Sequence, residues 1–391
     1  MAEKWEHARI YEENEKAQEV EDEMTPRLFI SPSRYIQGSG VLSSLPKYAA
    51  SLGSNLLILT SKGSRKRLKN VFDQLESQNE MTVHVEIFTG ECTMEEIRRV
   101  GRTCREKGVD VIVGLGGGKV IDTAKAIAHY EGLKLIVAVT TASSDAPCSA
   151  LSIIYKEDGS LDQLLWLKTN PDIVLADLSV IVRAPAHLLA AGIGDAMATY
   201  YEMKECWERD ADNFCGGRIT LAAKAIAEQC CKTILEDGYD AYVSAQKHCI
   251  TRAFENVVEA NTLLSGLGFE SGGICAAHPV NNGLAELPQT HGHMHGEKVA
   301  FALLCQFVLT KEKKETIKSV MELFVKVGLP VTLKELGITA ITEQELEQTV
   351  QIACGDPCIR NLPLRVEEEY VKGAIIQADA MGQEFLETRK Q

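Results

Sequence analysis

The sequence lacks the features that mark secreted, membrane-spanning and nucleic-acid-binding proteins. Its 391 residues contain no stretch of 18 apolar residues, and the N-terminal arm has no apolar segment typical of a signal peptide. Positive charge is also in deficit, because 41 Lys and Arg residues face 55 Asp and Glu residues, which gives a net charge of −14. We therefore expect no membrane partner and no nucleic-acid partner.

Cysteine is plentiful, but paired cysteine motifs are scarce. Twelve cysteines in a long chain without a secretory signal predict a reducing, cytoplasmic location. The one compact pair, Cys354 and Cys358, has no second pair nearby to complete a zinc knuckle. We therefore interpret both as free thiols.

Internal repeats and low-complexity linkers are absent as well, and the length favours two domains. Residues 1–26 form an acidic extension, of which residues 1–24 hold nine acids and three bases. Residues 27–184 alternate apolar runs with helical patterns, which predicts an α/β domain with a parallel sheet covered on both faces. Residues 185–391 carry almost unbroken helical periodicity, which predicts an all-helical second domain.

Apolar runs and helical periods place the elements of the first domain. The pair Asp158-Gly159, between two alternating runs, predicts a β-hairpin. Helices are expected at residues 95–108 and again directly after Lys119. The expected strands span residues 56–60, 83–88, 109–115, 134–140 and 172–177.

A glycine-rich turn, GLGGGK at residues 114–119, separates a predicted strand from a predicted helix. Exposed N–H groups at a helix N-terminus form an anion site suited to a pyrophosphate, and glycine is needed because a Cβ would keep the phosphate away. The spacing is not that of GxGxxG, and Val120 stands where a Walker P-loop needs Ser or Thr. On spacing alone, a nucleotide site and a tight structural turn both stay open.

A polar run, TTASSDAPCSA at residues 140–150, follows the strand predicted for residues 134–140. It offers hydroxyl groups and the carboxylate of Asp145 at the carboxyl end of a sheet strand, where open α/β folds bind ligands. The hydroxyl groups belong to Thr140, Thr141, Ser143 and Ser144. A loop of small polar residues without a ligand is the alternative.

Four of the nine histidines, His278, His291, His293 and His295, fall within 18 residues. Neutral imidazole is the commonest metal ligand, and a catalytic metal site typically has three protein ligands and an open position. Asp195 is the odd charged residue at an otherwise apolar helix start, and it would complete such a set. A polar loop and a helix-capping aspartate are the alternatives for these residues.

Together these motifs resemble the glycerol dehydrogenases of the iron-containing, or group III, alcohol dehydrogenase superfamily. The resemblance covers essentially everything after residue 26. It implies an N-terminal dinucleotide-binding α/β domain, a C-terminal helical metal-binding domain, and an active site between them. The motifs that carry it are SPSRYIQGSGVL, GECTMEEI, GLGGGKVIDTAKA, TTASSDAPCSALSIIY, NPDIVLAD, GIGDAMATYYE, AAHPVNNG, HGHMHGEKVAF and ADAMGQEF.

The resemblance also implies roles for individual residues. Asp145 would contact the polyol, and His291 is a candidate neighbour of the metal, with a plain loop histidine as the alternative. The metal ligands would be Asp195, His278 and His295. The cofactor pyrophosphate would lie on Gly117, Gly118, Lys119 and Asp122, and the rest of the cofactor on Thr140, Thr141, Ser143, Ser149, Leu151 and Tyr155.

One position separates branches of the superfamily. Iron-dependent members carry a histidine four residues after the metal aspartate, where this chain has Thr199. Three protein ligands resemble the zinc-using glycerol dehydrogenases. The resemblance thus implies an enzyme that uses Zn²⁺ and NAD or NADP to interconvert glycerol, or a related diol, and its ketone, dihydroxyacetone for glycerol. It also implies a homo-oligomer, in this family often an octamer.

Two departures from the family pattern bear on cofactor and substrate. The family often has an acid after its second strand, whereas this chain has Thr60 and Ser61, followed by basic residues. Hydroxyls with basic neighbours can accept a 2′-phosphate, so we expect NADP(H) to be accepted, with a basic solvated helix start as the alternative. Asn281 replaces a family histidine, which puts glycerol itself in question against a related carbonyl or diol. The basic residues are Lys62, Arg65, Lys66 and Arg67.

Three rival functions remain. A reductase of another small aldehyde or hydroxyketone would use the same site. A dehydroquinate-synthase-like lyase would need a dense Lys/Arg cluster, but the metal segments hold only Lys298. A non-enzymatic binding protein would be expected to lose the metal ligands, all three of which are present.

Overall fold

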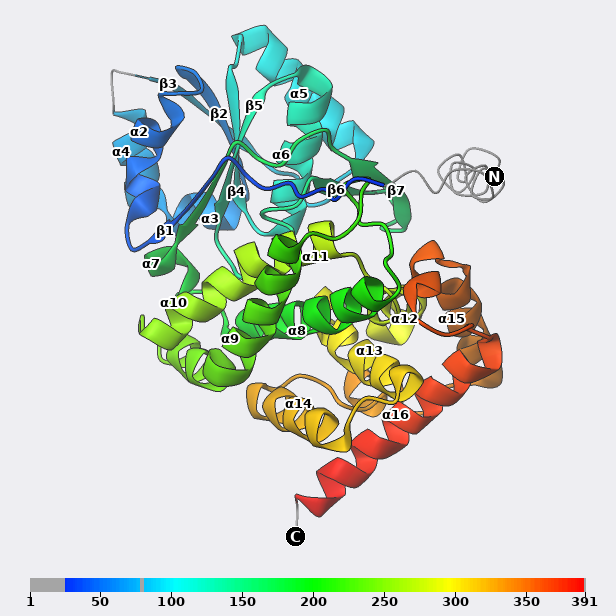
Figure 1. Ribbon diagram of the computed structural model, residues 1–391. Coiled ribbons are helices and arrows are strands. Elements are labelled where there is room, and N and C mark those ends of the chain that lie inside the picture. Colours follow the sequence, from blue (N-terminus) through cyan, green and yellow to red (C-terminus); the bar gives the residue numbers. More distant parts are fainter. Residues whose placement is uncertain (1–24, 78–80, 390–391) are drawn as a thin grey trace.

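The structure, a computed structural model, describes residues 25–77 and 81–389. A parallel sheet with helices on both faces lies beside a larger, purely helical part that begins at α8 (Ala186–Glu208) (Figure 1). All but the last two residues of the acidic extension expected at 1–26 lie outside the described residues.

The main sheet has six parallel strands in the order β1-β8-β5-β4-β2-β3. All five strands expected from apolar runs are present. The sixth, β1, was not expected; its sequence RYIQG is only half-buried, and it lies at the sheet edge against β8. The strands are β1 (Arg34–Gly38), β2 (Asn55–Thr60), β3 (Thr82–Ile87), β4 (Val111–Gly116), β5 (Lys134–Val139) and β8 (Ile173–Asp177).

Helices cover both faces of this sheet, as expected from its fully apolar strands. Leu56 and Ile58 of β2 pack in one hydrophobic cluster together with Phe72 of α4, while Leu57 and Leu59 belong to the cluster on the other face. Figure 1 shows α2 (Leu45–Ala49), α3 (Lys62–Arg67) and α4 (Lys69–Glu76) on one side of the sheet, and α5 (Met94–Lys107) and α6 (Gly118–Glu131) on the other.

The predicted hairpin is confirmed. Strands β6 (Leu151–Tyr155) and β7 (Leu161–Trp166) pair in antiparallel fashion as a separate two-stranded sheet. Gly159 takes a left-handed φ of 83° in the connecting turn, a conformation that glycine adopts without steric cost.

After β8 the described residues contain helices and no further named strand, as the periodicity predicts. Helix α8 lies at the centre of this part and packs against α9, α11 and α13. Within residues 25–77 and 81–389, no helix is both long and apolar enough to cross a membrane. The helices are α7 (Leu178–Ile181), α8, α9 (Leu221–Gln246), α10 (Arg252–Glu259), the π-helical η3 (Ala260–Leu264), α11 (Ser265–Gly272), α12 (Ala277–Ala285), α13 (His295–Thr310), α14 (Lys314–Val327), α15 (Glu343–Gly355) and α16 (Glu368–Thr388).

Candidate active site

The glycine turn contains glycines of two kinds. A Cβ on Gly114 would lie 2.8 Å from Cβ of Ala124, and one on Gly116 would lie 2.7 Å from Cβ of Val120, so both let α6 pack closely on β4. A Cβ on Gly118 would meet no atom within 4 Å, and one on Gly117 would meet only Thr141 Oγ1, at 3.5 Å. The first pair serves packing, whereas the second leaves bare backbone facing open space at the N-terminus of α6, which fits a pyrophosphate.

Lys119 and Asp122, on the first turns of α6, lie in different surroundings. Lys119 is exposed and pairs with Glu91 at 2.5 Å. Asp122 is buried, and its carboxylate lies 4.0 Å from Nζ of Lys125. Burial raises the pKa of Asp122 to about 6. Their roles toward a cofactor stay predictions.

Lys125 connects the helix of the glycine turn to the polar loop after β5. Its side chain is completely buried, and its ammonium donates to the carbonyl of Ala146, to Ser149 Oγ at 3.3 Å and to the carbonyl of Leu151 at 2.8 Å. These three acceptors match the three donors of an ammonium group. Lys125 was not predicted as a site residue, although a lysine among the apolar residues of a buried helix is a recognisable signal.

The polar run 140–150 lies between the sheet and the helical part. Asn261 of η3 donates to the carbonyl of Ala142 at 2.9 Å, and Glu270 of α11 accepts the N–H of Ala150 at 2.5 Å. Thr141 Oγ1 and Ser143 Oγ lie 3.3 Å apart. Helices of the second part therefore hold the segment predicted to line the cofactor.

The expected cofactor residues further along this segment differ in exposure. Thr140 and Ser149 are buried, and Leu151 is half-buried at the start of β6. Tyr155, at the end of β6, is half-buried, and burial raises the pKa of its hydroxyl to about 12. It therefore stays neutral at physiological pH and can donate a hydrogen bond.

Asp195, His278 and His295, here called the ligand trio, come from three helices and meet. The Nε2 atoms of His278 and His295 lie 3.6 Å and 3.3 Å from Asp195 Oδ1, and one ligand atom from each residue falls within 4.8 Å of the others. Asp195 is the tenth residue of α8, so the helix-cap alternative for it is wrong. Its Oδ1 is buried and accepts no hydrogen bond, which fits a bound cation.

Glu202 contacts His278 on the Nδ1 side of its ring. Its Oε2 lies 2.5 Å from Nδ1 of His278, and its Oε1 accepts the N–H of His278 at 3.0 Å and that of Cys275 at 3.1 Å. This contact leaves Nε2 facing Asp195, the arrangement that a metal-binding histidine needs. Burial alone would lower the pKa of His278, but the charges of Glu202 and Asp195 outweigh it and raise the pKa.

Glu202 was not predicted as a site residue. It stands seven residues after Asp195, two turns along the same face of α8. An acid at that spacing on an apolar helix is the signal that could have identified it.

Asp145 lies directly beside the ligand trio. Its N–H donates to Asp195 Oδ2 at 3.4 Å, and its carboxylate accepts from Ser265 Oγ at 3.3 Å. Burial, and then the charge of Asp195, raise the pKa of Asp145 to about 7. Thr199 hydrogen-bonds Ser265 at 2.8 Å and is not a member of the ligand trio.

The other histidines of the cluster lie outside the trio. His291 is exposed after the short helix η4 (Pro288–Thr290), and within the described residues its side chain makes no hydrogen bond or ion pair. Nδ1 of His293 lies 3.4 Å from Oε2 of Glu297. The buried Asn281 has its amide nitrogen 3.4 Å from Nδ1 of His295. A catalytic role for His291 stays a prediction.

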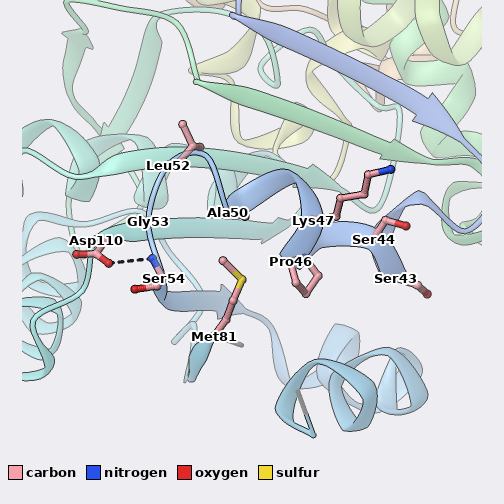
Figure 2. A pocket seen from close by; sticks show the side chains of 10 residues that line it. All are labelled: Ser43, Ser44, Pro46, Lys47, Ala50, Leu52, Gly53, Ser54, Met81 and Asp110. Atoms are coloured by element: carbon pink, nitrogen blue, oxygen red, sulfur yellow. Dashed lines mark hydrogen bonds between the residues drawn. The ribbon is translucent and has the colours of Figure 1, made fainter. Parts of the chain in front are cut away.

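A separate hollow of about 830 Å³ opens at the other end of the sheet (Figure 2). Ser54 and Asp110, which line it, directly precede β2 and β4, and the N–H of Ser54 donates to Asp110 at 3.0 Å. Open α/β sheets bind ligands at the carboxyl ends of their strands, whereas this hollow is at the amino ends. The candidate active site is therefore the region between the glycine turn and the ligand trio.

The chain is similar to known proteins over most of its length. A family model for iron-containing alcohol dehydrogenase matches residues 32–178. A glycerol dehydrogenase of Escherichia coli O6:H1 is 42% identical over 92% of this chain and 99% of its own. A glycolaldehyde reductase of Halobacterium salinarum is 37% identical over 91% of this chain and 98% of its own.

A solved structure extends the similarity to three dimensions. The crystal structure of glycerol dehydrogenase from Schizosaccharomyces pombe matches with a TM-score of 0.89 at 37% identity, over 94% of this chain and 93% of that one. The similarity therefore covers both the sheet and the helical part.

Proposed function

Because the chain belongs to the iron-containing alcohol dehydrogenase family, we propose that it interconverts glycerol, or a related small 1,2-diol, and the corresponding ketone. The observation that carries this proposal is the position of Asp145, which contacts Asp195 of the ligand trio. Asp145 lies on the loop that Lys125 connects to the helix of the glycine turn. In that arrangement, a substrate hydroxyl would lie near a metal site, a carboxylate and a dinucleotide site.

The ligand trio would hold one divalent metal. A metal held there would supply Lewis-acid chemistry to the alcohol, and a bound nicotinamide would supply the hydride acceptor. Three protein ligands, with Thr199 hydrogen-bonded elsewhere, favour Zn²⁺ and leave a coordination position for substrate. Glu202 would fix the ring of His278.

Asp145 would orient the polyol through a hydrogen bond. Gly117 and Gly118 would receive the pyrophosphate on N–H groups that no side chain shields. Thr140, Thr141, Ser143, Ser149, Leu151 and Tyr155 would line the rest of the cofactor.

We propose a cytoplasmic location for the protein. All twelve cysteines are free, which agrees with a cytoplasmic protein. We propose a homo-oligomer, an octamer on the family pattern.

A second candidate function is the reduction of a small hydroxyaldehyde such as glycolaldehyde. The relative from Halobacterium salinarum bears that name, and Asn281 lies against His295 where the family pattern has a histidine. This candidate differs from the first in substrate, not in chemistry.

A substrate panel tests both candidates. Glycerol, 1,2-propanediol, dihydroxyacetone, hydroxyacetone and glycolaldehyde are assayed in the appropriate direction with NAD(H) and NADP(H). We expect the highest kcat/KM for glycerol among the alcohols and for dihydroxyacetone among the carbonyls. A glycolaldehyde value well above that for dihydroxyacetone would favour the second candidate, and no turnover of any compound would contradict both.

A further inference from the structure

Strand β2, next to the glycine turn, ends in a position suited to bind the adenosine ribose. Strand β2 pairs with β4 in parallel, with Thr60 opposite Leu115, so the carboxyl end of β2 lies beside the turn. In dinucleotide-binding sheets, an acid on the neighbouring strand binds the ribose 2′-hydroxyl, whereas a nearby arginine accommodates a 2′-phosphate. The residues after Thr60 therefore bear on which dinucleotide is used.

Of the two hydroxyl residues at this strand end, only Ser61 is open to a ligand. Thr60 is completely buried, and its Oγ1 is enclosed by protein. Ser61 is half-buried and caps α3 by accepting the N–H of Ser64 at 3.1 Å. Neither position carries the acid that binds a ribose 2′-hydroxyl in other dinucleotide-binding sheets.

Ser61 belongs to a connected polar cluster. Its Oγ donates to Ser64 Oγ at 3.1 Å, and Nη2 of Arg67 donates to the same oxygen at 3.1 Å. Ser64 is 2% exposed, and its buried hydroxyl connects the hydroxyl of Ser61 to the guanidinium of Arg67. We call Ser61, Ser64 and Arg67 the ribose-end cluster.

The charge around this cluster is positive in a chain whose net charge is −14. Residues 61–72 hold five basic side chains and no acid. Two of the five are neutralised, because Arg65 pairs with Glu76 at 2.7 Å and Lys69 pairs with Asp73. Lys62, Lys66 and Arg67 are exposed, and none of them has a carboxylate partner in the described part of the chain. Three such cations favour a phosphate over a plain ribose hydroxyl.

We propose that the ribose-end cluster binds the 2′-phosphate of NADP(H), with Arg67 as the principal cation. The proposal rests on the dinucleotide seat of the proposed function. The two arginines of α3 then have different roles. Arg67 binds the phosphate, whereas Arg65 packs on Phe72, with its Cζ 4.2 Å from the centre of the ring.

Two substitutions and one control test it. Arg67→Ala removes the cation. Ser61→Asp adds a carboxylate and keeps the cap of α3, because Asp caps helices as well as Ser does. Lys69→Ala, two residues beyond Arg67, removes a cation that already has a partner. Each protein is titrated with adenosine 2′,5′-bisphosphate and with 5′-AMP by calorimetry, and kcat/KM is measured with NADPH and NADH.

The native protein is expected to bind adenosine 2′,5′-bisphosphate more tightly than 5′-AMP. Arg67→Ala and Ser61→Asp should each lower the NADPH-to-NADH ratio of kcat/KM by about 10- to 100-fold, while Lys69→Ala leaves the ratio unchanged. Equal binding of the two nucleotides, or unchanged ratios in both variants, would overturn the proposal and leave a basic solvated helix. The calorimetry needs no turnover, so it separates this failure from a failure of the proposed function.

Discussion

Oε2 of Glu202 lies 2.5 Å from Nδ1 of His278, and Nε2 of the same ring faces Asp195 at 3.6 Å. One face of α8 therefore carries both the residue that would bind the metal and the residue that orients a second ligand. Because Glu202 is completely buried, its carboxylate has no solvent alternative to this contact.

Glu202→Gln should weaken metal binding without changing the ligand set. An amide cannot hold the imidazole as firmly as a carboxylate does, so the Kd for Zn²⁺ should rise about 10- to 100-fold. Competition with a coloured chelator measures this Kd. Glu208→Gln, at the exposed end of the same helix, is the matched control and should leave the Kd unchanged. Equal Zn²⁺ affinity in the Glu202 variant and the native protein would refute the role of Glu202.

The two kinds of glycine in the turn should respond oppositely to alanine. Gly118→Ala adds a Cβ that meets no protein atom, so Tm should stay the same or rise, while dinucleotide binding weakens at least about tenfold. Gly114→Ala adds a Cβ at 2.8 Å from Ala124 and should cost about 1–3 kcal/mol of unfolding free energy. Thermal unfolding and NADH titration measure both effects. Tight NADH binding by Gly118→Ala would place the pyrophosphate elsewhere.

Thr199→His should not convert the site to four protein ligands. Thr199 is buried, its hydroxyl bonds Ser265, and its Cγ2 lies 2.6 Å from where a Cβ on Gly268 would be, so a larger ring has no space. We expect a loss of about 1–3 kcal/mol of stability and no gain in metal affinity. Thr199→Ser keeps the hydroxyl and serves as the control. Tighter Fe²⁺ binding with unchanged Tm in the histidine variant would contradict this prediction.

Helix α5, which packs against α6, should show a defined pH response through Glu96. Burial alone would raise its pKa, but hydrogen bonds from Arg99, at 2.7 Å and 2.9 Å, and from Thr89 lower it. A carboxyl group whose folded pKa is depressed stabilises the fold above its unfolded pKa, about 4.3, and this contribution is lost as the pH falls through the folded pKa.

Glu96→Gln should therefore lower the free energy of unfolding by about 1–3 kcal/mol at pH 7, and the difference from the native protein should shrink below about pH 4. Urea titrations at several pH values measure it. Glu95→Gln, the exposed neighbour in the first turn of α5, should change stability by less than about 0.5 kcal/mol. A difference that stays constant down to pH 3 would exclude this linkage.

Local sequence pattern accounts for much of the fold. The strands β2, β4 and β5 are continuous apolar runs because both faces are buried, and such runs are visible without a structure. The edge strand β1 is half-buried and carries Arg34 and Gln37, so its composition does not separate it from a loop. Its pairing with β8 depends on residues far along the chain.

The candidate site was predictable in its residue types and less so in its contacts. Asp195, His278 and His295 stand out by type, but their meeting depends on how three helices pack. Lys125 and Glu202 are charged residues on buried helices, a signal that was present in the sequence. The bond from Ala150 to Glu270 joins the loop to α11 across 120 residues, and no local pattern reports it.

We propose that turnover requires a metal held by the ligand trio. The most direct test measures dinucleotide-linked oxidation of glycerol by the native protein after metal removal with EDTA and again after Zn²⁺ is restored, with Asp195→Asn measured alongside. Removal should abolish turnover, Zn²⁺ should restore it in the native protein only, and Asp195→Asn should still bind NADH. Full turnover after complete metal removal, or in the Asp195 variant, would contradict the account.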